Sequence, residues 1–122
     1  MKYESNGYMY ILTERLTVKL FKPSLNVVSK DICISQGTIV IEEGFKWDGA
    51  TCAIDTPDFM RGSCVHDALY TLILRGKLPT SFRSSADKVL FNLCREDGMT
   101  LFRASYVYAA VRLFGAKHVS KG

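Results

Sequence analysis

The sequence lacks long apolar runs, paired cysteines and a strong charge of one sign. Its longest apolar stretches are about ten residues, too short for the roughly 20 that a membrane-spanning helix needs. None of the four cysteines forms a Cys-x-x-Cys pair, which excludes the zinc-ribbon and thiol-redox signatures. The net charge of +4 comes from scattered lysines and arginines, so we expect a solvated surface and no nucleic-acid binding.

The sequence also shows no export signal at its start. Residues 1–6 are polar, and no apolar signal-peptide segment follows them. We therefore expect a protein that is not secreted, and without export we expect no disulfides. Cys64 and Cys94 fall at apolar helical positions and are predicted to be small core residues.

The overall composition of the chain suits one globular domain over residues 1–122. The chain is 48% hydrophobic and 11% aromatic, enough for a core, and 23% charged, which is ordinary for a globular protein. Strand patterns come first and helix patterns follow. This order predicts an α+β fold, with helices packed on one face of an antiparallel sheet.

The β region is predicted over residues 8–43, with about four strands. Residues 8–12 and 16–20 are rich in aromatic and β-branched side chains, and the polar residues 13–15 between them predict a hairpin. A second hairpin is predicted from 31–35 and 38–41, which flank Gln36 and Gly37. Residues 42–44 are expected to close the sheet region.

The helical region is predicted over residues 57–115. Thr56 and Pro57 suit a helix start, and Gly76 suits its end, with a break expected near Gly62. Further helices are predicted over 84–96 and from Thr100 to residue 115. The last is apolar nearly all round, so we expect it to lie centrally or to face a partner chain.

Between these regions, residues 44–56 have no periodic pattern. They contain Trp47, Asp48, Gly49 and Thr51, and loops between a sheet and a helix often carry function. The alternative is a tight turn with a core tryptophan.

The most informative segment is residues 66–70, where His66 and Asp67 interrupt an apolar helix. Buried ionisable groups are costly unless they are paired, so a partner is expected, and Asp87 on the next helix is the candidate. Tyr70 shares the helical face of His66. Asp67 points elsewhere, and together with Asp48 it is a candidate ligand for a divalent cation.

Structural explanations for the same residues stay open. Ser84 and Asp87 match a capping box, in which Asp87 only completes a helix start. Asp67 would then pair with Arg61 or Arg83 at the surface, and His66 would be a satisfied core histidine.

Several segments resemble a family of small phage and prophage proteins of unknown function. The family carries a Gly-Phe-x-x-Asp-Gly-Ala-Ser segment, a His-Asp-x-Leu-Tyr helix, an Arg-x-x-Ala-Asp helix start and a late aromatic-Gly pair. The corresponding segments here are 44–51, 66–70, 83–87 and 111–115, with Thr51 in place of the usual serine. The resemblance implies a bacteriophage source, in the host cytoplasm or in the virion. It implies no activity.

The His-Asp-x-x-Tyr string is also similar to the signature of secreted phospholipases of the A-two type. That similarity implies that His66 is the base for water and Asp67 a calcium ligand. It implies that Asp87 and Tyr70 orient the histidine. The Cys-rich and Gly-rich calcium loop of those enzymes is absent here.

Three functions follow as hypotheses. The first is a His/Asp hydrolase acting on an ester or lipid, with a cation such as calcium as its cofactor. The second is a virion or assembly component in which the cluster is structural and the apolar third helix meets protein partners or other copies of the chain. The third is a small inhibitor of a host protein.

Overall fold

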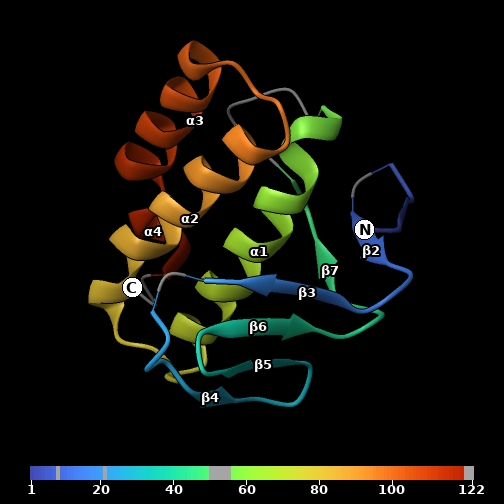
Figure 1. Cartoon of the computed structure of the whole chain (residues 1–122), viewed down its shortest axis with the longest axis vertical. Coiled ribbons are helices and arrows are strands. Elements are labelled where there is room, and N and C mark those ends of the chain that lie inside the picture. Colours follow the sequence, from blue (N-terminus) through green and yellow to red (C-terminus); the bar gives the residue numbers. More distant parts are fainter. Residues whose placement is uncertain (8, 21, 50–55, 120–122) are drawn as a thin grey trace. The chain divides into compact units, whose positions relative to one another are not determined.

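The computed structural model describes residues 1–7, 9–20, 22–49 and 56–119, which form two compact units (Figure 1). The first spans residues 1–49 and the second residues 50–122. The first holds two small antiparallel sheets and the second holds the helices, so the predicted α+β class is confirmed. The boundary between the units falls inside the segment that we predicted to be an irregular loop.

One sheet of the first unit has the strand order β1-β2-β7. Its strands are β1 (Tyr3–Ser5), β2 (Tyr10–Leu12) and β7 (Lys46–Trp47). Rings from each strand meet: the Tyr3 and Tyr10 centroids are 5.8 Å apart, and those of Tyr10 and Trp47 are 5.6 Å apart. Trp47 is almost fully buried. Its role in the described structure is therefore that of a packed aromatic.

The other sheet has the order β3-β6-β5-β4. Its strands are β3 (Leu16–Lys19), β6 (Thr38–Ile41), β5 (Ile32–Ser35) and β4 (Val27–Val28). The predicted hairpin between β5 and β6 is confirmed, and Gln36 and Gly37 both have positive φ, as the favoured hairpin turn requires. A Cβ at Gly37 would lie 2.6 Å from the backbone oxygen of Lys22, so this position needs glycine.

The predicted hairpin between the first two strands is wrong. β2 pairs with β1 and β7, whereas β3 pairs with β6. The backbone of Leu12 exchanges hydrogen bonds with Phe45 and Gly44, so the returning chain occupies the edge that β3 would have used. The sheet region also does not close at residues 42–44, because β7 follows. The described residues hold seven strands, more than predicted, because β1, β4 and β7 are too short to give a sequence pattern.

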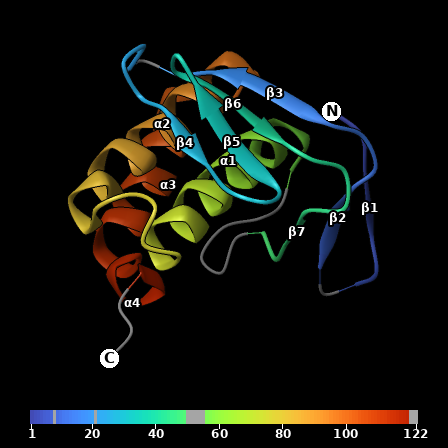
Figure 2. The same ribbon diagram turned by 90° about the horizontal axis from the view of Figure 1, so that it is seen from below.

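The described part of the second unit contains three longer helices and two short ones. They are α1 (Pro57–Leu74), η1 (Thr80–Phe82), α2 (Arg83–Glu96), α3 (Leu101–Phe114) and α4 (Ala116–Val119). The two views show α2 between α1 and α3, and α2 packs against both (Figures 1 and 2). The starts at Pro57 and Thr100 are confirmed; the Thr100 hydroxyl accepts a hydrogen bond from the amide of Arg103.

The predicted break at Gly62 is wrong, because α1 is continuous through it. A Cβ on Gly62 would lie 3.1 Å from Leu90 Cδ1 and 3.2 Å from Cys94 Sγ. The glycine therefore lets α2 approach α1 closely. Cys64 and Cys94 are buried, as predicted, and burial raises the pKa of both thiols, that of Cys94 to about 12.

α3 is not a central helix. Among its residues Ala104, Val107 and Ala110 are buried, while Phe102 is 87% exposed and Leu113 75% exposed. In the described part of the chain, no helix is both long enough and apolar enough to cross a membrane.

Candidate functional site

The candidate site lies within the helical unit and begins on α1. His66 and Tyr70 sit one turn apart on the same helical face, where their ring centroids are 4.2 Å apart. Both side chains are buried against the rest of the structure. This spacing directs His66 Nε2 and the Tyr70 hydroxyl at one point on the neighbouring helix.

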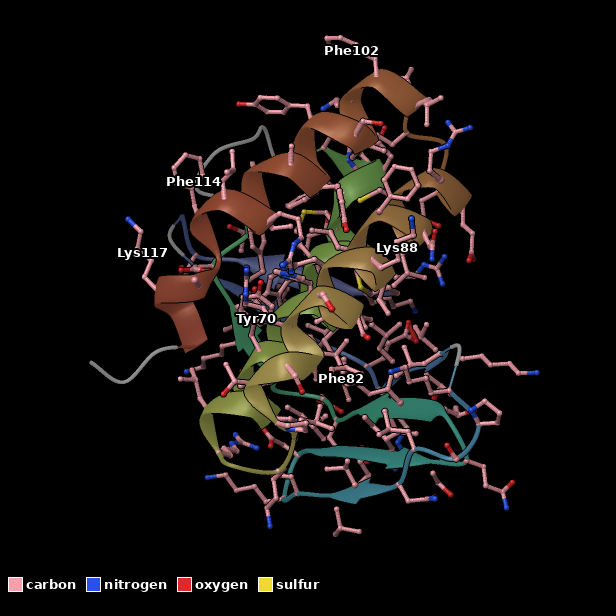
Figure 3. The ribbon with its side chains drawn as sticks, turned by 90° about the vertical axis from the view of Figure 1, so that its left-hand side faces the viewer. Tyr70, Phe82, Lys88, Phe102, Phe114 and Lys117 are labelled. Atoms are coloured by element: carbon pink, nitrogen blue, oxygen red, sulfur yellow. The ribbon has the colours of Figure 1, made fainter. Side chains whose placement is uncertain are left out.

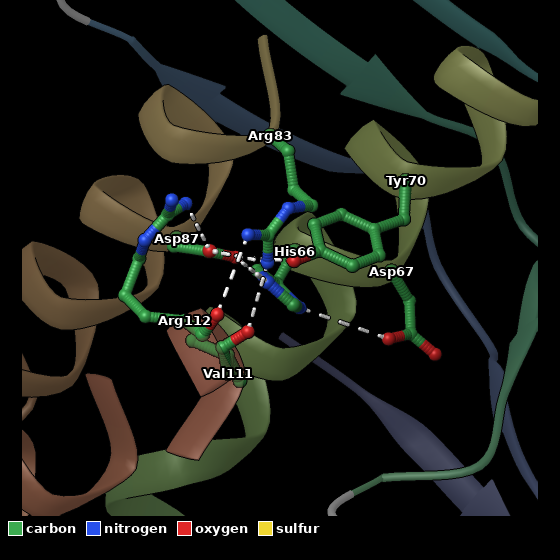
Figure 4. Close-up of polar contacts among 7 residues, drawn as sticks. All are labelled: His66, Asp67, Tyr70, Arg83, Asp87, Val111 and Arg112. Atoms are coloured by element: carbon green, nitrogen blue, oxygen red, sulfur yellow. Dashed lines mark hydrogen bonds and ion pairs between the residues drawn. The ribbon is translucent and has the colours of Figure 1, made fainter. Parts of the chain in front are cut away.

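That point is the carboxylate of Asp87, which is fully buried near the start of α2. Its Oδ1 atom lies 2.7 Å from His66 Nε2 and accepts a hydrogen bond of 2.5 Å from the Tyr70 hydroxyl (Figure 4). The structure therefore brings together the three residues that the sequence predicted as a group. Asp87 does not cap its helix: α2 has no side-chain cap, so the capping-box alternative is wrong.

The second carboxylate oxygen is held by two arginines. Arg112 on α3 donates to Asp87 Oδ2 at 2.9 Å, and Arg83 donates to the same atom at 3.4 Å. With both oxygens engaged, the buried carboxylate has four donors, about as many as it can accept. Such pairing is what makes a buried charge tolerable.

Arg83 also binds the end of α3. Its guanidinium donates to the carbonyl oxygens of Val111 at 3.0 Å and Arg112 at 3.3 Å (Figure 4). Carbonyl groups in the last turn of a helix carry partial negative charge, which a cation stabilises. One side chain thereby ties Asp87 to α3.

The network controls the ionisation of its members. Burial alone would raise the pKa of Asp87, but hydrogen bonds from His66 and Tyr70, the charge of His66 and the hydrogen bond from Arg112 outweigh it, and the pKa is lowered. Asp87 is therefore ionised at neutral pH. Burial and the hydrogen bond to Asp87 raise the pKa of Tyr70, which stays protonated as a donor.

These charges fix the tautomer of His66. An ionised carboxylate only accepts hydrogen bonds, so Nε2 carries the proton shared with Asp87, and in the neutral ring Nδ1 holds the lone pair. Nδ1 faces Asp67, whose Oδ1 is 4.0 Å away and whose side chain is 31% exposed. The His66 side chain is 9% exposed. A proton acceptor is thus held on a largely buried ring by a fully buried carboxylate.

Gly115 lies against the same network, directly after α3. A Cβ at this position would lie 2.4 Å from the Tyr70 hydroxyl oxygen, 2.5 Å from the Val111 oxygen and 3.1 Å from the near nitrogen of Arg83. Its φ of −69° is open to any residue, so it is the close approach that requires glycine.

The other predicted residues lie outside the helical network described above. Trp47, Asp48 and Gly49 belong to the first compact unit, and Thr51 falls outside the described residues, so their roles stay predictions. Among the residues described, no three His, Cys, Asp or Glu side chains are grouped so that they would hold a metal ion. A cation bound by Asp67 and Asp48 stays a prediction.

Arg61 binds Glu96 and Asp97, and Arg83 binds Asp87. The suggested pairing of Asp67 with one of these arginines stays a prediction. The network also contains two residues for which no such role was predicted, namely Arg112 and Gly115. Both stand in the segment 111–115 that carries the family resemblance, which was the one available signal.

Comparison with known proteins found no match to this chain among protein-family models, curated proteins or solved structures. The resemblances to phage proteins and to phospholipases therefore stay predictions, and the function has to be argued from the site.

Proposed function

We propose that this protein is a hydrolase in which His66 is the general base for a water molecule and Asp87 and Tyr70 are its positioning residues. The observation that carries the proposal is the 2.7 Å contact between His66 Nε2 and a fully buried, ionised Asp87. A histidine base needs an acceptor on one ring nitrogen so that the other is free for the proton. Here the free nitrogen is Nδ1, on the side of the ring that faces Asp67.

The substrate class is a carboxylic ester, with lipids included. Nδ1 of His66 takes a proton from water while the water oxygen forms a bond to the ester carbonyl carbon. When the tetrahedral intermediate collapses, the bond to the alcohol oxygen breaks, and the proton on Nδ1 passes to that oxygen. The Asp87 carboxylate stabilises the imidazolium between these two steps, and the Tyr70 hydroxyl holds the carboxylate in place.

The predicted resemblances support the same assignment. In secreted phospholipases of the A-two type, the corresponding residues are the base, the aspartate that orients it and a supporting tyrosine. A bacteriophage source, implied by the other resemblance, is part of the proposal. The proposed step uses no metal ion, and the role of Asp67 as a calcium ligand is a separate prediction.

The test measures ester hydrolysis by the full chain on short-chain esters and on phospholipid vesicles. We expect turnover by the wild type and at least a hundredfold loss in His66→Ala, the usual scale of general-base catalysis. His118→Ala removes the chain's other histidine and is the matched control. Circular dichroism melting shows whether each variant is folded, and full turnover by folded His66→Ala would refute the proposal.

The cation prediction has its own experiment. Isothermal titration of calcium into the wild type is expected to give binding that Asp67→Asn abolishes. If the two proteins give the same titration, Asp67 is not a calcium ligand, and the general-base proposal is unaffected.

A second candidate is a virion or assembly component in which the cluster only joins helices. It is favoured by the observation that Asp87 accepts hydrogen bonds from all three long helices. This candidate predicts that His66→Ala lowers the melting temperature while the wild type hydrolyses no ester. It also predicts that mass spectrometry finds the protein in purified phage particles; its absence there would count against this function.

A further inference from the structure

The outward face of α3 carries large apolar side chains. Phe102 is 87% exposed, Tyr106 54% and Leu113 75%, and Phe102 projects away from the helices in Figure 3. These positions lie opposite the buried stripe of Ala104, Val107 and Ala110, because side chains repeat around a helix every 3.6 residues. The helix therefore has an apolar face on each side.

The spacing on the outward face is regular. Phe102, Tyr106, Ala109 and Leu113 follow one another at intervals of four, three and four residues, the pattern of a seam between two packed helices. This set, here called the α3 seam, extends for about 16 Å at 1.5 Å per residue. It contains no charged residue.

The charged residues of α3 are already engaged within the chain. Arg103 pairs with Asp58, and Arg112 pairs with Asp87. Amphipathic helices that bind membranes usually present unpaired lysines and arginines beside their apolar face. Because both arginines of α3 form ion pairs with carboxylates of the same chain, its surface suits an apolar protein partner better than an anionic membrane.

We propose that the α3 seam is a self-association surface through which two copies of this chain pack their α3 helices antiparallel. In this arrangement Phe102 lies against the partner's Leu113, and Tyr106 lies against the partner's Ala109. A bulky residue thus meets a small one at the centre, and the two-fold axis repeats both contacts, as a symmetric interface requires. The inference is independent of the proposed hydrolase function.

The exposed side chains of α3 supply most of the area of a dimer interface. Exposed large side chains on α3 also include Leu101 at 58% and Phe114 at 50%, beside the seam. At about 150–250 Å² per large side chain, scaled by the exposed fraction of each, the face offers roughly 600 Å². Stable interfaces bury about 800 Å² per partner, so one helix supplies most of what is needed.

Sedimentation equilibrium of the full chain tests the proposal. We expect a monomer–dimer equilibrium in the wild type and a dissociation constant at least tenfold higher in Leu113→Glu, which places a charge in the seam. Val28→Glu makes the same kind of change at a residue that is 78% exposed on β4, and it is the matched control. A wild type that stays monomeric at concentrations up to about 100 μM would overturn the proposal.

Mixing two variants tests the antiparallel orientation. Phe102→Lys and Leu113→Glu should each dimerise poorly alone and should form a mixed dimer together, because the new lysine then faces the new glutamate. Failure of the mixture to recover dimer contradicts the antiparallel seam. Vesicles of phosphatidylcholine and phosphatidylglycerol test the other occupant: a monomeric chain that binds them through Phe102 would replace self-association with membrane binding.

Discussion

Two ionic clusters join α1 to α2, and they differ in their access to water. Near the start of α1, Arg61 binds Asp97 at 2.9 Å and Glu96 at 3.1 Å, and these side chains are 26–64% exposed. Further along, His66 and Tyr70 bind Asp87, whose side chain is fully buried. The same helices are thus connected once through solvent-exposed charges and once through a sealed carboxylate.

The difference lies in what replaces a lost partner. Water solvates Glu96 or Asp97 when Arg61 is removed, so the exposed cluster contributes little to stability. No water reaches Asp87, so each donor to it matters and its position is tightly defined. A precisely held carboxylate is what a histidine base requires, and the proposed function therefore rests on the buried cluster.

Removal of the buried carboxylate should have the largest effect. Asp87→Ala leaves His66 and Tyr70 without their acceptor and Arg83 and Arg112 without their counter-ion. We expect the free energy of unfolding to fall by about 3–5 kcal/mol. Urea denaturation measures it, and Asp97→Ala, which removes the exposed carboxylate directly after the same helix, should cost less than about 1 kcal/mol. Equal losses in the two variants would remove the distinction.

Gly115→Ala should have the next largest effect. The added Cβ would lie 2.4 Å from the Tyr70 oxygen and 2.5 Å from that of Val111, so the end of α3 must shift. Overpacking of this kind costs about 1–3 kcal/mol. At Gly62 the added Cβ would meet Leu90 and Cys94 side-chain atoms at 3.1 and 3.2 Å, and helix propensity favours alanine. Thermal melting should therefore show a smaller loss for Gly62→Ala, and the reverse order would show that α3 does not need to approach Tyr70 so closely.

Acid should weaken the buried cluster. The pKa of Asp87 is lower in the folded chain than its ordinary value of 3.8, so the unfolded chain takes up this proton first. The stability due to ionised Asp87 is complete above that value and is lost as the pH falls through the folded pKa. Tyr70→Phe removes one hydrogen bond that lowers the pKa, so the stability difference between this variant and the wild type should shrink from pH 6 to pH 3. Urea titrations measure it, and a difference that stays constant until acid unfolds the wild type would show that the Tyr70 hydrogen bond does not lower the pKa of Asp87.

The exposed cluster should respond least, and mainly to salt. We expect Arg61→Met to change the free energy of unfolding by no more than about 1 kcal/mol, because exposed ion pairs contribute little. At 1 M salt, where charges are screened within about 3 Å, even this effect should vanish. The effect of Asp87→Ala should persist at the same salt concentration, and parallel denaturation curves with and without salt measure both.

Local patterns predicted part of this structure. The strands on either side of Gln36 and Gly37 were predictable because the turn residues and the alternating side chains agree. Asp87 was predictable as the partner of His66 because two consecutive helices tend to pack side by side. The pairing of β2 with β7 joins residues more than thirty positions apart, and no local pattern encodes it.

The role of Arg112 was hidden for the same reason. An arginine in the last turn of a helix is ordinary, since it favours the helix dipole. Its contact with Asp87 depends on where α3 packs against α2, which is decided by the whole unit. Gly115 likewise follows a helix, as glycines often do, and the crowding around it exists only after folding.

The position of Arg83 has a consequence for motion in the folded state. Helix ends normally fray, and their amides exchange hydrogen quickly. Here the last carbonyls of α3 and the Asp87 carboxylate share one guanidinium, so the end of α3 cannot open without disturbing the buried cluster. The amide of Gly115, which donates to Val111, should therefore exchange nearly as slowly as amides in the middle of α2. Arg83 makes the opening of the helix end and the opening of the buried cluster a single cooperative event.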